Sequence, residues 1–227
     1  MPQPKPIPAV KALLRLIQGN KRFIKSRSSG VSAVNRDNRK LMIKNRGPFA
    51  IILSCSDSRA PSEILFDQGL GDLFIIRVAG NVVAPSLIGS VEFAAATTQA
   101  RLVVVMGHTQ CGAILATYDA IEGKKPAFSE NIRDIVERIK PNILHLISLK
   151  KTSARSTSKV SAKNTAKKDA VLRASSRANA LASANHLRHA SRFLEDMVQN
   201  QKLLIVGAEY DIETGVVDFF DVPAMKK

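Results

Sequence analysis

Five short, continuous apolar runs constrain the fold of this chain more than any other feature of its sequence. Each has the length of a strand, and none alternates regularly with polar residues, although Arg77 and Asp218 interrupt two of them: 49–53, 73–78, 102–106, 203–206 and 216–220. A strand that is apolar on both faces must be covered on both faces, as strands of parallel sheets are. The runs therefore predict a buried and mostly parallel sheet.

Helix-length segments separate these runs. An amphipathic stretch precedes the first run at 10–25, and the others lie between the runs: 87–98, 113–121, 132–149 and 179–198. Only residues 210–215 separate the last two runs, which is short enough for a hairpin. We therefore predict an α/β fold with a mostly parallel central sheet of four strands, an antiparallel edge strand and helices on both faces.

Positive charge is concentrated outside these runs. The net charge is +15; residues 1–46 hold twelve Lys and Arg against one acid, and residues 150–177 hold nine against one. A basic surface of this size can attract nucleic acid, anionic lipid or small anions. The segment 150–177 has no aromatic residue to stack on bases, as single-strand binders usually require. Solvated surface is therefore the simpler interpretation of this charge.

Chemistry-bearing residues follow two of the runs. Cys55, Asp57 and Arg59 come after the first run, and His108 and Cys111 come after the third, three residues apart. In open parallel sheets, functional groups gather at such strand ends. Two cysteines and a histidine, with a fourth position left open, are the donor set of a catalytic zinc site. Taken singly, each residue has a plainer interpretation, either as an apolar filler or as an ordinary ion pair.

The charge of this donor set predicts how a bound water would behave. Two thiolates and a neutral imidazole cancel the formal charge of zinc, whereas three histidines leave +2 and bring the pKa of bound water to about 7. Water here should be acidified less, so activity should rise on the alkaline side of neutrality. Asp57 would either orient the bound hydroxide or occupy the fourth position itself, and Arg59 could hold it off the metal.

Two further features bear on location. No apolar run approaches the roughly 18 residues that would span a bilayer. Because the two cysteines would serve as thiolate ligands, a disulfide between them is not expected, and a reducing cytoplasm is the expected location.

Several stretches of this sequence resemble the β-class carbonic anhydrases. The stretches CSDSR at 55–59 and GHTQCG at 107–112 are similar to the zinc-site signatures of that family. Further stretches agree in order and spacing: GNKRF at 19–23, GDLFIIRVAGN at 71–81, GSVEF at 89–93 and VGAEYDIETG at 206–215. The resemblance covers nearly the whole chain except residues 150–178.

The resemblance implies a reaction and a cofactor. One Zn²⁺ per subunit would be held by Cys55, His108 and Cys111, and the reaction would be the reversible hydration of carbon dioxide to bicarbonate and a proton. Zinc-bound hydroxide would attack the carbon. Asp57 would accept a hydrogen bond from the hydroxide and would be oriented by Arg59.

The resemblance also implies an assembly. The family forms homodimers, often paired into homotetramers, with the substrate in a small apolar pocket at the dimer interface. Residues 1–46 would form an arm and a helix that packs on the partner subunit. Residues 47–227 would form the zinc-binding catalytic domain, with a basic low-complexity insertion or weak surface helix at 150–178. By position, the substrate pocket would be lined by Phe74, Ala79, Phe93 and Gly112.

Two departures from the family pattern bear on substrate and regulation. Arg46 stands where many members have a glutamine that hydrogen-bonds the substrate, and it would either hold bicarbonate or point elsewhere. Members regulated by bicarbonate have a tryptophan three residues before the first zinc cysteine. This chain has Ile52 there and no tryptophan at all, so we expect no bicarbonate site of that kind.

Two other functions stay open. Relatives with this fold act on small linear molecules such as carbon disulfide, and nothing in the pocket residues selects between the substrates. Alternatively, a basic protein with a structural zinc would bind polyanions through its flanks. Such a protein would have no use for an open coordination position or for the Asp57–Arg59 pair. Its binding would be salt-sensitive and would be lost with residues 150–178.

Overall fold

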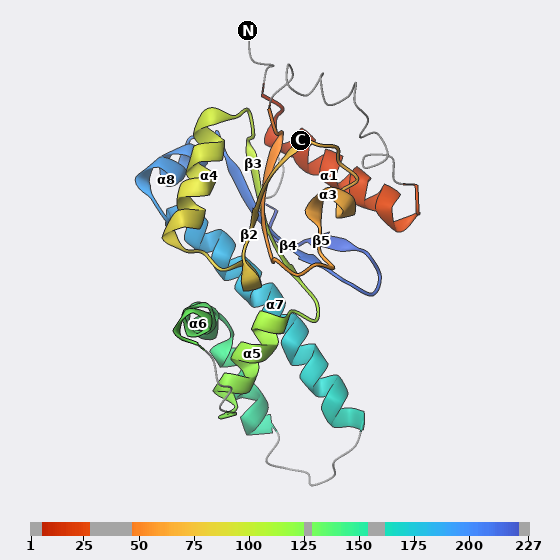
Figure 1. Ribbon diagram of the computed structural model, residues 1–227, viewed down its shortest axis with the longest axis vertical. Coiled ribbons are helices and arrows are strands. Elements are labelled where there is room, and N and C mark those ends of the chain that lie inside the picture. The colour runs from red at the N-terminus through yellow and green to blue at the C-terminus, as the bar shows by residue number, and fades with distance from the viewer. Residues whose placement is uncertain (1–5, 28–46, 125–128, 154–161, 223–227) are drawn as a thin grey trace.

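The computed structural model describes residues 6–27, 47–124, 129–153 and 162–222. Its centre is a five-stranded sheet in the order β2-β1-β3-β4-β5 (Figure 1). The first four strands pair in parallel, and β5 pairs antiparallel with β4. The predicted α/β fold, with its antiparallel edge strand, is thereby confirmed. The strands are β1 Ala50–Ser54, β2 Leu73–Arg77, β3 Leu102–His108, β4 Leu204–Tyr210 and β5 Val217–Phe219.

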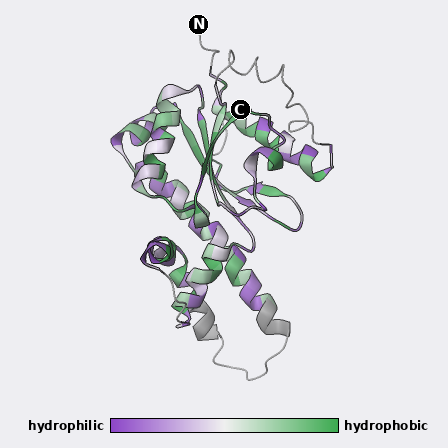
Figure 2. Ribbon diagram, in the orientation of Figure 1, coloured by the Kyte–Doolittle hydropathy of each residue, from purple (hydrophilic) through white to green (hydrophobic). Residues whose placement is uncertain are grey.

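Successive side chains of each strand enter apolar clusters on opposite faces of the sheet. Val104 points to one face, which α1 (Ala9–Ile24) and the short α3 (Ser62–Leu65) cover. Val103 points to the other face, which is covered by α4 (Pro85–Thr97), α7 (Ala162–His189) and α8 (Arg192–Gln199). Figure 2 shows the strands mainly hydrophobic between these two layers. Within the described residues, no helix is both long and apolar enough to cross a membrane.

The chain leaves β1 and β3 toward opposite faces of the sheet. After β1 it passes through α3 to β2, and after β3 it passes through α5 (Gly112–Ile121), α6 (Glu130–Ser153) and α7 toward α8 and β4. In doubly wound sheets, ligand sites lie where neighbouring strands diverge in this way. A third apolar cluster, which includes Ile114, Ile139 and Ile143, joins α5, α6 and α7 beyond this edge of the sheet (Figure 1).

Helix α7 is where the structure departs most from the sequence prediction. The single helix predicted for 179–198 is wrong: α7 begins at Ala162 and ends at His189, and the separate helix α8 follows. The sequence predicts an insertion or weak helix on the surface at 150–178, but the part of this stretch within α7 buries Ser175 and Ser176 completely or nearly so. The stretch is therefore partly packed against the sheet, although it contains few large apolar residues.

Helix α1 packs on the sheet of its own chain. The resemblance implies that this helix packs on a partner subunit, yet its inner residues Leu13 and Leu16 belong to the core of this chain. Residues 1–5 and 28–46 of the expected N-terminal part lie outside the described residues. Three apolar residues of α1 are more than a third exposed and leave an outer face open to a partner: Val10, Leu14 and Ile24.

Two residues near the end of α1 fix it to the sheet. The Asn20 carboxamide donates to the carbonyl oxygens of Leu65 at 3.1 Å and Gly215 at 2.9 Å, and its oxygen accepts the first backbone N–H of β5 at 2.9 Å. Gly19 lies against Phe66, where an added Cβ would come 1.7 Å from the carbonyl oxygen. The close approach of α1 therefore requires glycine at this position.

Adding one methyl group at Gly19 should destabilise the protein. We expect Gly19→Ala to lower the free energy of unfolding by about 1–3 kcal/mol, because α1 must move away from Phe66. Gly89→Ala in α4 is the matched control. Nothing among the described residues lies within 4 Å of that added methyl, and alanine favours a helix over glycine by about 1 kcal/mol. Urea unfolding followed by circular dichroism measures both variants. Equal stability of the two would contradict this packing of α1.

Candidate metal centre

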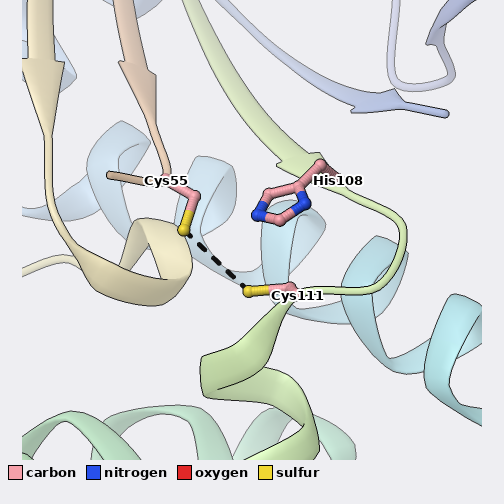
Figure 3. A group of neighbouring side chains, drawn as sticks. All are labelled: Cys55, His108 and Cys111. Atoms are coloured by element: carbon pink, nitrogen blue, oxygen red, sulfur yellow. Dashed lines mark hydrogen bonds between the residues drawn. The ribbon is translucent and has the colours of Figure 1, made fainter. Parts of the chain in front are cut away.

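The three expected donor residues meet at the carboxyl ends of β1 and β3. Cys55 follows β1 directly, His108 is the last residue of β3, and Cys111 immediately precedes α5. The two strands are neighbours, with Ser54 opposite Met106. Cys55 and His108 therefore leave the same edge of the sheet side by side. Figure 3 shows the three side chains pointing toward one another.

The spacing of the donor atoms suits a metal ion and not a disulfide. Both cysteines are free, and their sulfur atoms lie 4.0 Å apart, against about 2.05 Å in a disulfide. Two zinc–sulfur bonds of about 2.3 Å at a tetrahedral angle would separate the sulfurs by about 3.8 Å. The donor atoms of Cys55, His108 and Cys111 all lie within 4.8 Å of one another, and the three residues are buried.

His108 presents an unpartnered nitrogen to this group. Its Nδ1 lies 2.8 Å from the carbonyl oxygen of Thr109. Because a carbonyl only accepts, Nδ1 carries the proton and donates, which leaves the lone pair on Nε2. Nε2 is buried and has no hydrogen-bond partner among the described residues. A buried polar atom without a partner is rare, and a metal ion would satisfy this one.

The two cysteine sulfurs lie within hydrogen-bond distance and can share one proton. With Cys111 as the donor, this contact lowers the pKa of Cys55 to about 4 and raises the pKa of Cys111. The backbone N–H of Gly80 also donates to the Cys55 sulfur, at 3.3 Å. Cys55 is thus stabilised as a thiolate, the form that binds metals. A divalent cation would take the place of the shared proton.

Asp57 and Arg59 form a closed pair beside this donor group. Arg59 Nε and Nη2 donate to the two carboxylate oxygens at 2.9 and 2.8 Å, and the Arg59 backbone N–H donates at 2.9 Å. The guanidinium hydrogen bonds hold the pKa of Asp57 well below its usual range. Among the described residues, the carboxylate of Asp57 is not part of the donor group. In this geometry Arg59 binds the Asp57 carboxylate, which lies outside the donor group.

Two residues that the sequence reasoning missed brace the loops of the site. Arg77, the last residue of β2, donates to the carbonyl oxygens of Cys55 at 3.0 Å and Asp57 at 2.5 Å. Arg59 donates to the carbonyl oxygen of Gln110 at 3.2 Å. Gln110 adopts a left-handed conformation with φ of 58°, which is uncommon for a residue with a side chain. The position of Arg77 at a strand end is the signal that could have identified it.

The residues expected to line a substrate pocket occupy different surroundings. The rings of Phe74 and Phe93 are neighbours, with centroids 6.5 Å apart, and Phe93 is 61% exposed. Ala79 begins the 3₁₀ turn η1 (Ala79–Asn81) and precedes Gly80, whose backbone N–H donates to the Cys55 sulfur. Gly112 begins α5 and follows Cys111 directly. Arg46 lies outside the described residues.

The fold and the site together define a class of protein. The chain is an α/β protein with a buried Cys–His–Cys group that could hold a metal ion. The group lies at the ends of two neighbouring parallel strands, where the chain leaves toward opposite faces of the sheet. The sequence model of the family described as carbonic anhydrase matches residues 50–217. The match includes both strand ends that carry the donor group.

Individual relatives agree with this match. Carbonic anhydrase from Mycolicibacterium smegmatis is 42% identical over 149 residues, which cover 63% of this chain and 68% of the relative. Carbonic anhydrase 2 from Mycobacterium tuberculosis is 41% identical over 145 residues, which cover 63% and 67%. A tetrameric β-carbonic anhydrase from Sordaria macrospora has the same fold, with a TM-score of 0.66 at 15% identity over 92% of this chain and 97% of that one. The chain therefore belongs to the β-carbonic anhydrase family of enzymes.

Removing the guanidinium group of Arg59 should change the titration of Asp57. We expect Arg59→Ala to raise the pKa of Asp57 toward its ordinary value of about 4, because the charged form loses its side-chain hydrogen bonds. NMR titration of the carboxyl carbon in reduced, metal-free protein measures this pKa. Arg133→Ala removes an exposed arginine of α6 and should leave the Asp57 titration unchanged. An unshifted Asp57 in Arg59→Ala would contradict the pairing.

Proposed function

We propose that this chain is a zinc-dependent carbonic anhydrase that converts carbon dioxide and water reversibly to bicarbonate and a proton. The observation that carries the proposal is the convergence of the Cys55 and Cys111 sulfurs with the unpartnered Nε2 of His108. Three protein donors with a further position for water are the ligand set of a catalytic zinc site. Membership of the carbonic anhydrase family supports the choice of reaction.

In this proposal, zinc supplies an activated water for attack on carbon dioxide, and the chain's own residues orient that water. The Asp57 carboxylate stays ionised because Arg59 binds both of its oxygens. An ionised carboxylate only accepts hydrogen bonds. Asp57 would therefore favour a molecule at the metal that has a proton to donate. Arg77 would keep Asp57 in place through its bonds to the backbone of this loop.

We further propose that the active site is completed at a dimer interface. Phe93 is exposed beside Phe74, and large exposed apolar patches usually mark interaction sites. A second copy over this face would enclose a substrate pocket that includes Ala79 and Gly112, and Arg46 would hold bicarbonate. The tetrameric relative from Sordaria macrospora supports an oligomer. A hollow of about 380 Å³ on this face is lined by Gly89, Glu92, Phe93, Ala96, Thr97 and Phe193.

The same proposal assigns roles to the two parts of the chain. Residues 1–46 would contact the partner subunit through the exposed outer face of α1, and residues 47–227 would form the catalytic domain. Cysteine ligands require a reducing environment when no metal is bound. We therefore propose a cytoplasmic location.

The two alternative functions have less support. Carbon disulfide would occupy the same site. If zinc-loaded protein turns over carbon disulfide but does not hydrate carbon dioxide, carbon disulfide is the substrate. A polyanion-binding surface needs unpaired positive charge, but three basic residues of α7 pair with carboxylates of this chain. These pairs are Lys168–Asp119 at 3.7 Å, Arg173–Asp211 at 2.9 Å and Arg177–Asp218 at 2.7 Å.

Activity should depend on zinc and rise with pH. We expect one zinc per chain and a hydration rate that climbs from about pH 6.5 to about pH 9, because two thiolates offset the charge of the ion and water at the site is acidified less than in a three-histidine site. Stopped-flow spectrophotometry with a pH indicator measures the rate. Cys55→Ser should lose both zinc and activity. Activity that survives removal of zinc by a chelator would contradict the proposal.

Asp57 should matter for turnover and not for metal binding. We expect Asp57→Ala to retain zinc and to lose at least about 10²-fold in kcat/KM, because the nucleophilic water is no longer oriented. Asp134→Ala is the matched control, since Asp134 also pairs with an arginine, Arg138, on the exposed surface of α6. Its kcat/KM should equal that of the unmodified protein. Full activity in zinc-loaded Asp57→Ala would remove the Asp–Arg pair from the mechanism.

A further inference from the structure

Helix α7 contacts the backbone of one metal donor and of a residue that hydrogen-bonds another. Ser176 Oγ donates to the carbonyl oxygen of His108 at 2.8 Å. Asn179 Nδ2 donates to the carbonyl oxygen of Gly80, also at 2.8 Å. Gly80 in turn donates its N–H to the Cys55 sulfur. Helix α7 therefore contacts the backbone of His108 directly, and it is linked to Cys55 through Gly80.

Asn179 has its orientation fixed by two hydrogen bonds. It is completely buried. Its Oδ1 accepts from Nδ2 of Asn142 in α6 at 3.0 Å, which leaves its Nδ2 directed at the carbonyl oxygen of Gly80. A carboxamide has distinct donor and acceptor ends. Because Asn142 donates on one side and the carbonyl oxygen of Gly80 accepts on the other, the Asn179 carboxamide can have only one orientation.

Gly80 occupies a conformation that needs this support. Its φ is 68°, in the left-handed region that glycine adopts at little cost. An added Cβ would come 2.7 Å from Ile139 Cδ1 and 3.0 Å from the Cβ of Ala113. Glycine is thus required here, and glycine is also the most flexible residue. The hydrogen bond from Asn179 restrains the carbonyl side of Gly80, while the N–H on the other side meets Cys55.

We propose that Asn179 is a positioning residue for the metal centre, which keeps the Gly80 N–H on the Cys55 sulfur by anchoring Gly80. This inference rests on the proposed zinc site. A hydrogen bond to a ligating sulfur fixes its position and withdraws electron density from it. Partners of this kind, one step removed from the metal, change metal affinity or activity by about 10- to 100-fold when they are replaced.

Two variants and one control separate this role from a purely structural one. Asn179→Asp is nearly isosteric. One carboxylate oxygen can still accept from Asn142, but the other faces the carbonyl oxygen of Gly80 and, in the ionised form that alkaline pH produces, has no proton to donate. Asn142→Ala removes the bond that orients Asn179, together with a longer 3.3 Å bond to the carbonyl oxygen of Arg138 in the same helix, and lies in a less buried position. Ser175→Ala is the control, because Ser175 lies on the same helix, is fully buried and has no partner for its hydroxyl among the described residues.

The readout is optical and does not depend on turnover. Cobalt(II) in place of zinc produces a sulfur-to-cobalt charge-transfer band in the near ultraviolet. We expect this band to move to longer wavelength in Asn179→Asp and by less in Asn142→Ala, because a sulfur that has lost its hydrogen bond is easier to oxidise. Competition with a chelator should show the zinc dissociation constant raised about 10- to 100-fold in Asn179→Asp. Ser175→Ala should keep the band and the affinity.

The possible outcomes distinguish this inference from the proposed function. Folded asparagine variants that keep the original band and zinc affinity would overturn the inference and leave Asn179 as a core residue only. If Asn179→Asp does not fold, the band of Asn142→Ala decides in the same way. If the unmodified protein binds cobalt without any sulfur charge-transfer band, the proposed zinc site itself is wrong.

Discussion

The parallel pairing of β1 with β3 is the constraint on which the rest of this structure depends. Because Ser54 lies opposite Met106, both strands end at one edge, and Cys55 meets His108 without any long excursion of the chain. A slip of one residue in this register would turn every side chain of the strand to the other face of the sheet. The positions of these donors are therefore fixed by the same packing that buries the strands.

Burying a donor group at strand ends also buries backbone polar atoms, which need partners. Helix α7 supplies them because its residues at the crossing are small. A Cβ at Gly107 of β3 would come within 3.0 Å of Ser176 Oγ, so glycine on the strand and serine on the helix together allow the contact. The abundance of small residues in this part of α7 then reflects close packing. It gives the helix access to the carbonyl oxygens of His108 and Gly80.

The parts of the molecule that could be predicted from sequence have local signals. Apolar runs indicated all five strands, and the spacing of cysteines and histidine after two of them indicated the donor group. The start of α7 could not be predicted, since close packing of small residues leaves no apolar periodicity at 150–178. In α1, the apolar pattern of the sequence assigns Val10 and not Ala12 to the core, but Val10 is exposed and Ala12 is fully buried. Arg77 and Gln110 join the site through backbone carbonyls, which any residue offers, so only the position of Arg77 at a strand end points to its role.

The basic residues of α7 show why net charge is a poor guide to binding surfaces here. Glu209 of β4 is only 3% exposed and lies 3.6 Å from Arg173 and 3.8 Å from Arg177. Burial raises the pKa of Glu209 in spite of both guanidinium groups. A carboxyl whose pKa is higher in the folded state costs stability as rising pH removes its proton, and the two arginines limit that cost. These two arginines thus help to hold the helix that carries Ser176 and Asn179 on the sheet, beside the metal donors. Much of the positive charge of α7 is therefore paired within the molecule.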